Sequence, residues 1–216
     1  MRPQFADAFF LGCTSFLLLH SINTPDFANF ALSVATAYVY ALAESSNWRA
    51  KSLLLFFLFG ILMFIPTLNH LILLLCATFF SSYFLFPTLS TRQIPVLKNL
   101  IIAAVWSCLF LLFKFEISLS ISVFLLVFAL SVIIDWGDKE KDPFQTIPKL
   151  LNTRHTLELT LVISIVPIAF LKQNIAFAVI PVIVLLQWYL THKKQRILRE
   201  LPLFCFALVY WFCENV

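Results

Sequence analysis

The feature that most constrains this chain is a series of uninterrupted apolar runs, each about 17–20 residues long, which is the length at which a helix crosses a hydrocarbon core of roughly 30 Å. The 216 residues are 61% hydrophobic and 12% charged, with a mean hydropathy of +0.94, whereas a soluble domain carries about 25% charged residues. A membrane β-barrel would instead show short alternating segments between turns. The pattern therefore predicts an all-α, polytopic membrane helix bundle with nine transmembrane helices, forming a single domain over 1–216. The expected spans lie near 5–22, 27–43, 52–68, 69–87, 97–113, 117–134, 155–171, 174–190 and 200–214.

The basic residues are distributed very unevenly between the two sides that nine spans create. Of the 15 lysines and arginines, only Lys114 and Lys172 fall on one side. The other side collects Arg2, Arg49, Lys51, Arg92, Lys98, Lys139, Lys141, Lys149, Arg154, Lys193, Lys194, Arg196 and Arg199. Because cytoplasmic loops carry the excess of Lys and Arg, we expect an integral membrane protein with its amino terminus cytoplasmic and its carboxyl terminus outside. The net charge of +4 then suits anionic membrane lipids as partners, and we expect no nucleic acid.

An acidic segment follows the sixth expected span and reads D-W-G-D-K-E-K-D-P-F-Q-T over 135–146. Asp135, Asp138 and Asp142 are three and four residues apart, so on a helix they share one face. Carboxylate oxygens at the mouth of a helix bundle suit Mg²⁺, which prefers oxygen ligands and often also binds substrate phosphates. The alternative is a solvated loop in which Lys139 and Lys141 balance the aspartates.

A basic segment precedes the fifth expected span, over 86–100. Arg92 and Lys98 flank Pro95, and Asn99 follows at the start of the span. Two cations at a helix entrance suit a phosphate group. The same residues would also stand there if they served membrane topology alone.

Together, the two segments resemble those of the UbiA superfamily of intramembrane prenyltransferases, which have nine transmembrane helices. Asp135, Thr146 and Pro148 keep the separation of the aspartate, threonine and proline in the family's second motif. Phe86 and Pro87 are similar to the Tyr-Pro at the end of the family's fourth helix. The first aspartate-rich motif is degenerate, since the segment after the second span reads A-E-S-S-N-W-R-A-K.

The resemblance implies transfer of an isoprenyl group from a prenyl diphosphate to an aromatic or lipidic acceptor, with Mg²⁺ as the cofactor. The implied catalytic residues are Asp135, Asp138 and Asp142. The implied substrate-binding residues are Arg92, Lys98, Asn99 and Lys139. The implied metal ligands are Asp135, Asp138, Asp142 and Glu44, with Asn47 the other oxygen ligand at the degenerate motif.

Two other functions are open on the sequence. The chain could be a catalytically silent relative that serves as a membrane scaffold or lipid-binding subunit, which the degenerate first motif favours. It could also be a small transporter, although a transporter has no need of three aspartates beside Arg92 and Lys98.

Overall fold

The computed structural model describes residues 4–21, 29–30, 32–34, 37, 69–75, 78, 94–113, 117–140, 145–170, 175–193 and 200–215. Every regular element in these ranges is a helix, and the all-α prediction is confirmed for this part of the chain. The elements are α1 (Gln4–Ser21), α5 (Pro95–Phe113), α6 (Ile117–Asp138), α7 (Ile147–Leu150), α8 (Thr153–Phe170), the 3₁₀ helix η2 (Ile175–Val179), α9 (Ile180–His192) and α10 (Leu201–Asn215).

Most of the expected spans that fall on described residues are helical. Helices occupy the positions expected at 5–22, 97–113, 117–134, 155–171, 174–190 and 200–214. The spans expected at 27–43, 52–68 and 69–87 lie largely or wholly outside the described residues. The count of nine therefore stays a prediction.

Helix α6 is the one described helix that is long and apolar enough by itself to cross a bilayer. Shorter apolar helical stretches lie at Asp7–His20, Val96–Cys108, Ala176–His192 and Leu201–Glu214. The core helix of a soluble protein can have the same length and composition, so the membrane location also stays a prediction.

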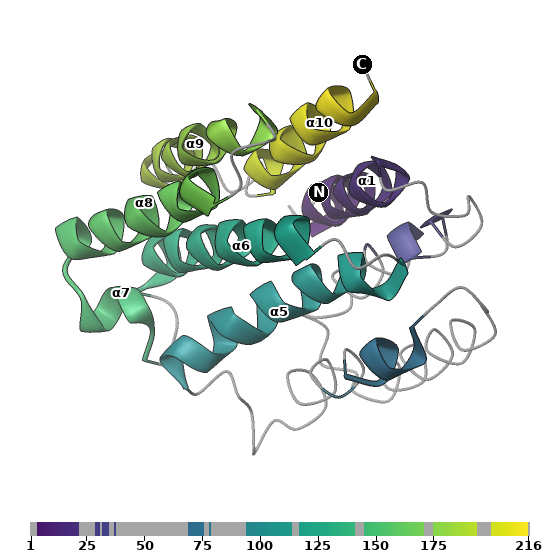
Figure 1. Ribbon diagram of the computed structural model, residues 1–216. Coiled ribbons are helices and arrows are strands. Elements are labelled where there is room, and N and C mark those ends of the chain that lie inside the picture. The colour runs from purple at the N-terminus through teal and green to yellow at the C-terminus, as the bar shows by residue number, and fades with distance from the viewer. Residues whose placement is uncertain are drawn as a thin grey trace.

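The same helix α6 lies at the centre of the bundle and contacts α5, α7, α8 and α9 (Figure 1). Its side chains are buried on several faces, with Val123, Leu126, Leu130 and Ile133 in the hydrophobic core. Helix α1 packs against α10, next to this central group. A helix that is apolar all round is expected to be enclosed in this way.

Contacts between helices show which ends lie together. Lys98, at the start of α5, meets Asp135 near the end of α6. Trp136, also near the end of α6, contacts Thr153 at the start of α8 and His192 at the end of α9. The starts of α5 and α8 and the ends of α6 and α9 therefore share one end of the bundle. These are the helix ends that the distribution of lysine and arginine assigns to one membrane side.

Local sequence signals explain why helices begin at this end. Proline is well suited to the first helical position because that position needs no amide donor, and Pro95 begins α5. Pro148 stands in the first turn of α7. The side-chain oxygen of Asn152 accepts a hydrogen bond from the backbone N–H of His155 at 2.8 Å, so it caps the start of α8.

Candidate functional site

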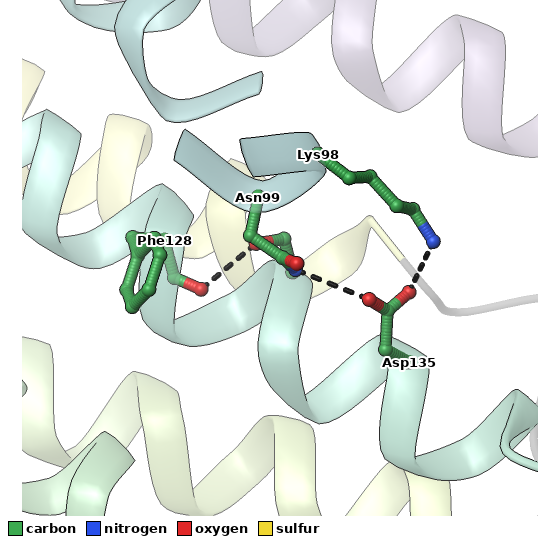
Figure 2. A network of polar contacts seen from close by, with 5 residues as sticks. Lys98, Asn99, Phe128 and Asp135 are labelled. Carbon is green, nitrogen blue, oxygen red and sulfur yellow. Dashed lines mark hydrogen bonds and ion pairs between the residues drawn. The ribbon is translucent and has the colours of Figure 1, made fainter. Parts of the chain in front are cut away.

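The centre of the candidate site is an ion pair between α5 and α6. The ammonium nitrogen Nζ of Lys98 lies 2.6 Å from Oδ1 of Asp135. The Asp135 and Lys98 side chains are only 5% and 13% exposed. The pair joins the first turn of α5 to the last turns of α6, as Figure 2 shows. Charges that are removed from water to this extent require a partner of opposite charge, and here Lys98 and Asp135 neutralise each other.

Asn99 extends the ion pair into a network. Its Nδ2 group donates to Oδ2 of Asp135 at 3.2 Å and to Oγ of Ser131 at 2.9 Å. The Ser131 hydroxyl donates in turn to the backbone carbonyl of Phe128 at 2.8 Å (Figure 2). We call Lys98, Asn99, Ser131 and Asp135 the α5–α6 polar cluster.

These bonds fix the orientation of the Asn99 amide. A flipped amide would turn its carbonyl oxygen toward the Asp135 carboxylate and toward a serine oxygen whose hydrogen is already used. The amide oxygen Oδ1 of Asn99 is consequently a buried acceptor without a hydrogen-bond partner in the described part of the protein. A buried oxygen in this condition is a position where a cation, a water or a donor group would be stabilised.

The structure places the predicted site residues unequally. Lys98, Asn99 and Asp135 are brought together. Asp138 is half-buried at the last residue of α6, three residues after Asp135. The Lys139 ammonium lies 6.0 Å from the centre of the Trp136 ring. Outside the described residues lie Arg92, Asp142, Glu44 and Asn47.

The oxygen atoms of the cluster suit Mg²⁺ in chemical type. Asp135 and Asp138 offer carboxylates, and Asn99 Oδ1 is a buried amide oxygen with no hydrogen-bond partner in the described part, all of them ligands that Mg²⁺ accepts. Within the described ranges, no three His, Cys, Asp or Glu side chains gather as a metal site. Both oxygens of Asp135 are held by Lys98 and Asn99 in this structure, so Mg²⁺ would compete with these donors for the carboxylate, and Asp142 would be a further carboxylate.

Thr146 and Pro148, which also carry the family resemblance, are both buried, while Phe86 and Pro87 lie outside the described residues. Thr146 and Pro148 flank the start of α7, which contacts α6 and α8. The backbone carbonyl of Thr146 accepts bonds from Lys149 and Leu150, while its hydroxyl Oγ1 is buried without a partner in the described residues. The acidic segment is therefore anchored at both of its ends, by Asp135 and by Thr146.

Aromatic residues hold the end of α6 against α8 and α9. The rings of Trp136 and Trp188 lie 4.4 Å apart between centroids. Trp136 Nε1 donates to Thr153 Oγ1 at 3.3 Å, and Trp188 Nε1 donates to Thr160 Oγ1 at 3.1 Å. Asp135 is thus carried by a helix end that is packed on several sides.

Sequence reasoning missed Ser131, which supports Asn99 from within the apolar span. The spacing of Ser131 and Asp135 could have revealed it, because residues four apart share a helix face. A serine one turn before a functional aspartate would then have been a candidate partner.

Comparison of the chain with models of protein families, with curated proteins and with solved structures gives no match in any of the three.

Proposed function

We propose that this protein is a UbiA-type intramembrane prenyltransferase-like protein that binds a prenyl diphosphate at the α5–α6 polar cluster and transfers the prenyl group to an aromatic or lipidic acceptor. The observation that carries this proposal is the direct contact of Lys98 and Asn99 with Asp135. The contact joins the basic and acidic segments that the sequence singles out, although 37 residues separate Lys98 from Asp135.

The charges at this end support a phosphate ligand. Lys98 lies in the first turn of α5 and Asn99 follows it, and the amino end of this 19-residue helix carries a partial positive charge that favours anions. The Lys98 ammonium would neutralise a phosphate oxygen directly. Lys139 stands in the turn that follows α6, and both it and Arg92 would add a further cation.

The apolar side chains around the polar cluster are suited to a prenyl chain. Helices α5 and α6 pack against each other, and both contribute buried apolar side chains to the core, among them Ala103, Val127 and Leu130. Such a water-poor environment strengthens electrostatic interactions with the diphosphate. With the chain in a membrane, the lipophilic acceptor would come from the bilayer.

Each residue of the site would have its own role in the proposed reaction. Asp135, Asp138 and Asn99 would hold Mg²⁺, with Asp142 and Glu44 as further candidate ligands, and the ion would supply charge neutralisation of the departing diphosphate. Lys98 would bind the same leaving group as a fixed cation. Ser131 and Asn99 would keep the Asp135 carboxylate in place.

A second candidate function is a catalytically silent relative that binds lipid or serves as a membrane subunit. Lys98 already neutralises Asp135 in this structure, which favours a site that is stable without a ligand. The two candidates differ in product formation: a silent relative would bind prenyl diphosphate or another lipid and release no diphosphate.

The proposal is tested with the full chain purified in mild detergent. Binding of geranyl, farnesyl and geranylgeranyl diphosphates would be measured with Mg²⁺ and with EDTA, and farnesol would serve as the control without a diphosphate. We expect Mg²⁺-dependent binding of at least one diphosphate, which the Glu158→Gln variant should retain because Glu158 pairs with Arg154 at an exposed site. Absence of binding to all three diphosphates would refute the proposal.

A further inference from the structure

We propose that the outer surface of helices α8 and α9 faces a lipid bilayer and binds an anionic phospholipid, with the lipid phosphate at Lys193 and the acyl chains along the apolar side chains beside it. We call this surface the α8–α9 outer face. It comprises Arg154, Glu158, Val162, Ile165, Val182, Leu185, Tyr189 and Lys193. None of these residues belongs to the α5–α6 polar cluster, so the inference goes beyond the proposed function and does not depend on prenyl transfer.

Helix α9 carries a graded stripe on its exposed side. Val182, Leu185 and Tyr189 are between 50% and 61% exposed, and Lys193 follows directly after the helix. Steps of three and four residues place these side chains on one helix face. The Lys193 ammonium lies 6.0 Å from the centre of the Tyr189 ring. The stripe therefore changes from aliphatic to aromatic to cationic toward the end of α9.

Helix α8 carries a similar gradient in the opposite sequence direction. Its exposed side presents first Arg154 and Glu158, which form an ion pair at 2.7 Å, and then Val162 and Ile165. Helices α8 and α9 pack side by side (Figure 1), and Trp136 contacts the start of α8 and the end of α9. The charged parts of both stripes consequently lie at the same end of the bundle, with the apolar parts further along both helices.

Exposed apolar side chains are not confined to α8 and α9. Large apolar residues are also exposed on α1, α5 and α10, among them Phe9, Val96 and Phe212. An exposed apolar surface marks contact with a protein partner or with a membrane. A protein partner would cover one patch, whereas a bilayer surrounds the bundle and contacts every outer helix. The distribution over five helices therefore favours lipid as the occupant of the α8–α9 outer face.

The charged end of this face selects the kind of lipid. A lysine keeps its ammonium at the level of the lipid headgroups while its carbon chain covers apolar surface, and tyrosine is enriched at the same level. In the described part of the chain, Arg154 pairs with Glu158, and no carboxylate forms an ion pair with Lys193. The positive charge of Lys193 is thus available to an anionic lipid phosphate.

Lipid contact is tested with nitroxide labels on single cysteines at Val162, Val182 and Leu185, in a cysteine-free full chain. The protein is placed in nanodiscs of phosphatidylcholine and phosphatidylglycerol in a three-to-one ratio. Dissolved oxygen, which concentrates in lipid, should relax these labels more than a water-soluble nickel complex does, while a label at the exposed His155 should respond to nickel. Labels shielded from both reagents would indicate a protein partner or a second copy, and labels that respond to nickel would indicate water; either result would overturn the inference.

The headgroup is tested by native mass spectrometry of the full chain in detergent, titrated with phosphatidylglycerol or with phosphatidylcholine. A lysine at a membrane surface strengthens the attraction to anionic lipid about fivefold. Lys193→Gln should therefore weaken the binding of phosphatidylglycerol by about fivefold and leave the binding of phosphatidylcholine unchanged. Equal binding of phosphatidylglycerol by the variant and the wild type would overturn the assignment of the phosphate to Lys193.

A matched control uses the same substitution at the same end of the bundle. Lys149 is exposed on α7, outside the α8–α9 outer face, so Lys149→Gln should leave the binding of phosphatidylglycerol unchanged. An equal loss in Lys149→Gln would show that the net charge of this end attracts the lipid without a site at Lys193, which would also overturn the inference. Neither assay contains a prenyl diphosphate, so the result is separate from that for the proposed function.

Discussion

At the scale of single residues, the α5–α6 polar cluster is built around one carboxylate, that of Asp135. Asp135 is 3% exposed and accepts bonds from both Lys98 and Asn99. Removing two charges from water costs several kcal/mol for each ion, which their attraction offsets only when both are present. Replacing one partner alone should therefore lower the free energy of unfolding more than replacing both together.

This asymmetry gives a prediction about stability. Asp135→Leu or Lys98→Met alone should lower the free energy of unfolding by about 3–5 kcal/mol, because each removes one ion of a largely buried pair. The double variant should lose less than the sum of the two. Thermal unfolding in mild detergent, analysed as a double-mutant cycle, measures the difference.

The exposed pair of Arg154 and Glu158 is the control for this cycle. Its nitrogen and oxygen are 2.7 Å apart, but the side chains are 85% and 51% exposed. Such a helix-surface pair contributes only about 0.3–0.5 kcal/mol, so Arg154→Met should barely change the unfolding temperature. Additive losses in the buried pair would contradict the account.

Sequence reasoning could predict the chemical types at the site and the meeting of its two segments, but not the individual hydrogen bonds. Lys98, Asn99 and Asp135 were candidates because cations and carboxylates at helix ends suit phosphate and metal. The sequence also predicts that Arg92 or Lys98 faces the aspartates, and the Lys98–Asp135 contact agrees with this. It could not single out Lys98 and Asp135 as the partners, because a contact across 37 residues depends on how α5 packs on α6. Ser131 looked like one more small residue within an apolar span.

At the scale of elements, the end of α6 differs from the expected boundary. The apolar run predicted a span over 117–134, with the acidic segment after it either helical or a solvated loop, and α6 continues to Asp138. The physical reason lies in a neighbouring helix: Lys98 neutralises Asp135, so the first charged residue does not have to leave the bundle. Composition alone locates helix centres well and helix ends poorly for this reason.

The contact of α6 with α9 depends on Gly137. A Cβ at this position would lie 2.5 Å from Cγ2 of Thr191, which is far inside contact distance. Replacing a helical glycine by alanine usually stabilises by up to about 1 kcal/mol. We expect Gly137→Ala to destabilise instead, by about 1–3 kcal/mol, because it overpacks this contact. Thermal unfolding of the variant shows whether the substitution stabilises or destabilises the protein.

A second substitution separates the steric effect from other causes. Thr191→Ser removes Cγ2 and keeps the hydroxyl that accepts a bond from Gln187 at 3.3 Å. The pair Gly137→Ala with Thr191→Ser should therefore regain most of the lost stability. Failure of this rescue would show that the approach of the two helices at Gly137 is not what limits the substitution.

At the scale of the whole molecule, the basic residues that the sequence assigned to the cytoplasmic side lie at one end of the bundle. Described residues there include Lys98, Lys139, Lys149, Arg154 and Lys193, on or next to five different helices. The sequence could predict this gathering because positive residues follow a simple topological rule. It could not predict that α6 would be central, since that depends on packing.

The orientation in a membrane gives a prediction of its own. Single cysteines introduced in a cysteine-free background at Trp48, Thr91, Gln145 and Gln195 should react with a membrane-impermeant reagent only from the cytoplasmic side. Cys213, exposed near the end of α10, should react from outside when it is the one cysteine retained. External labelling at any two of the first four positions would exclude the nine-span arrangement.

The central claim is that Asp135 carries Mg²⁺-dependent binding of a prenyl diphosphate, and one measurement tests it most directly. Equilibrium binding of farnesyl diphosphate would be compared between the wild type and Asp135→Asn, each with Mg²⁺ and with EDTA, after both are shown to be folded. We predict that the substitution weakens Mg²⁺-dependent binding by about a hundredfold, or about 2.7 kcal/mol. Equal affinity of the two proteins in the presence of Mg²⁺ would contradict the account.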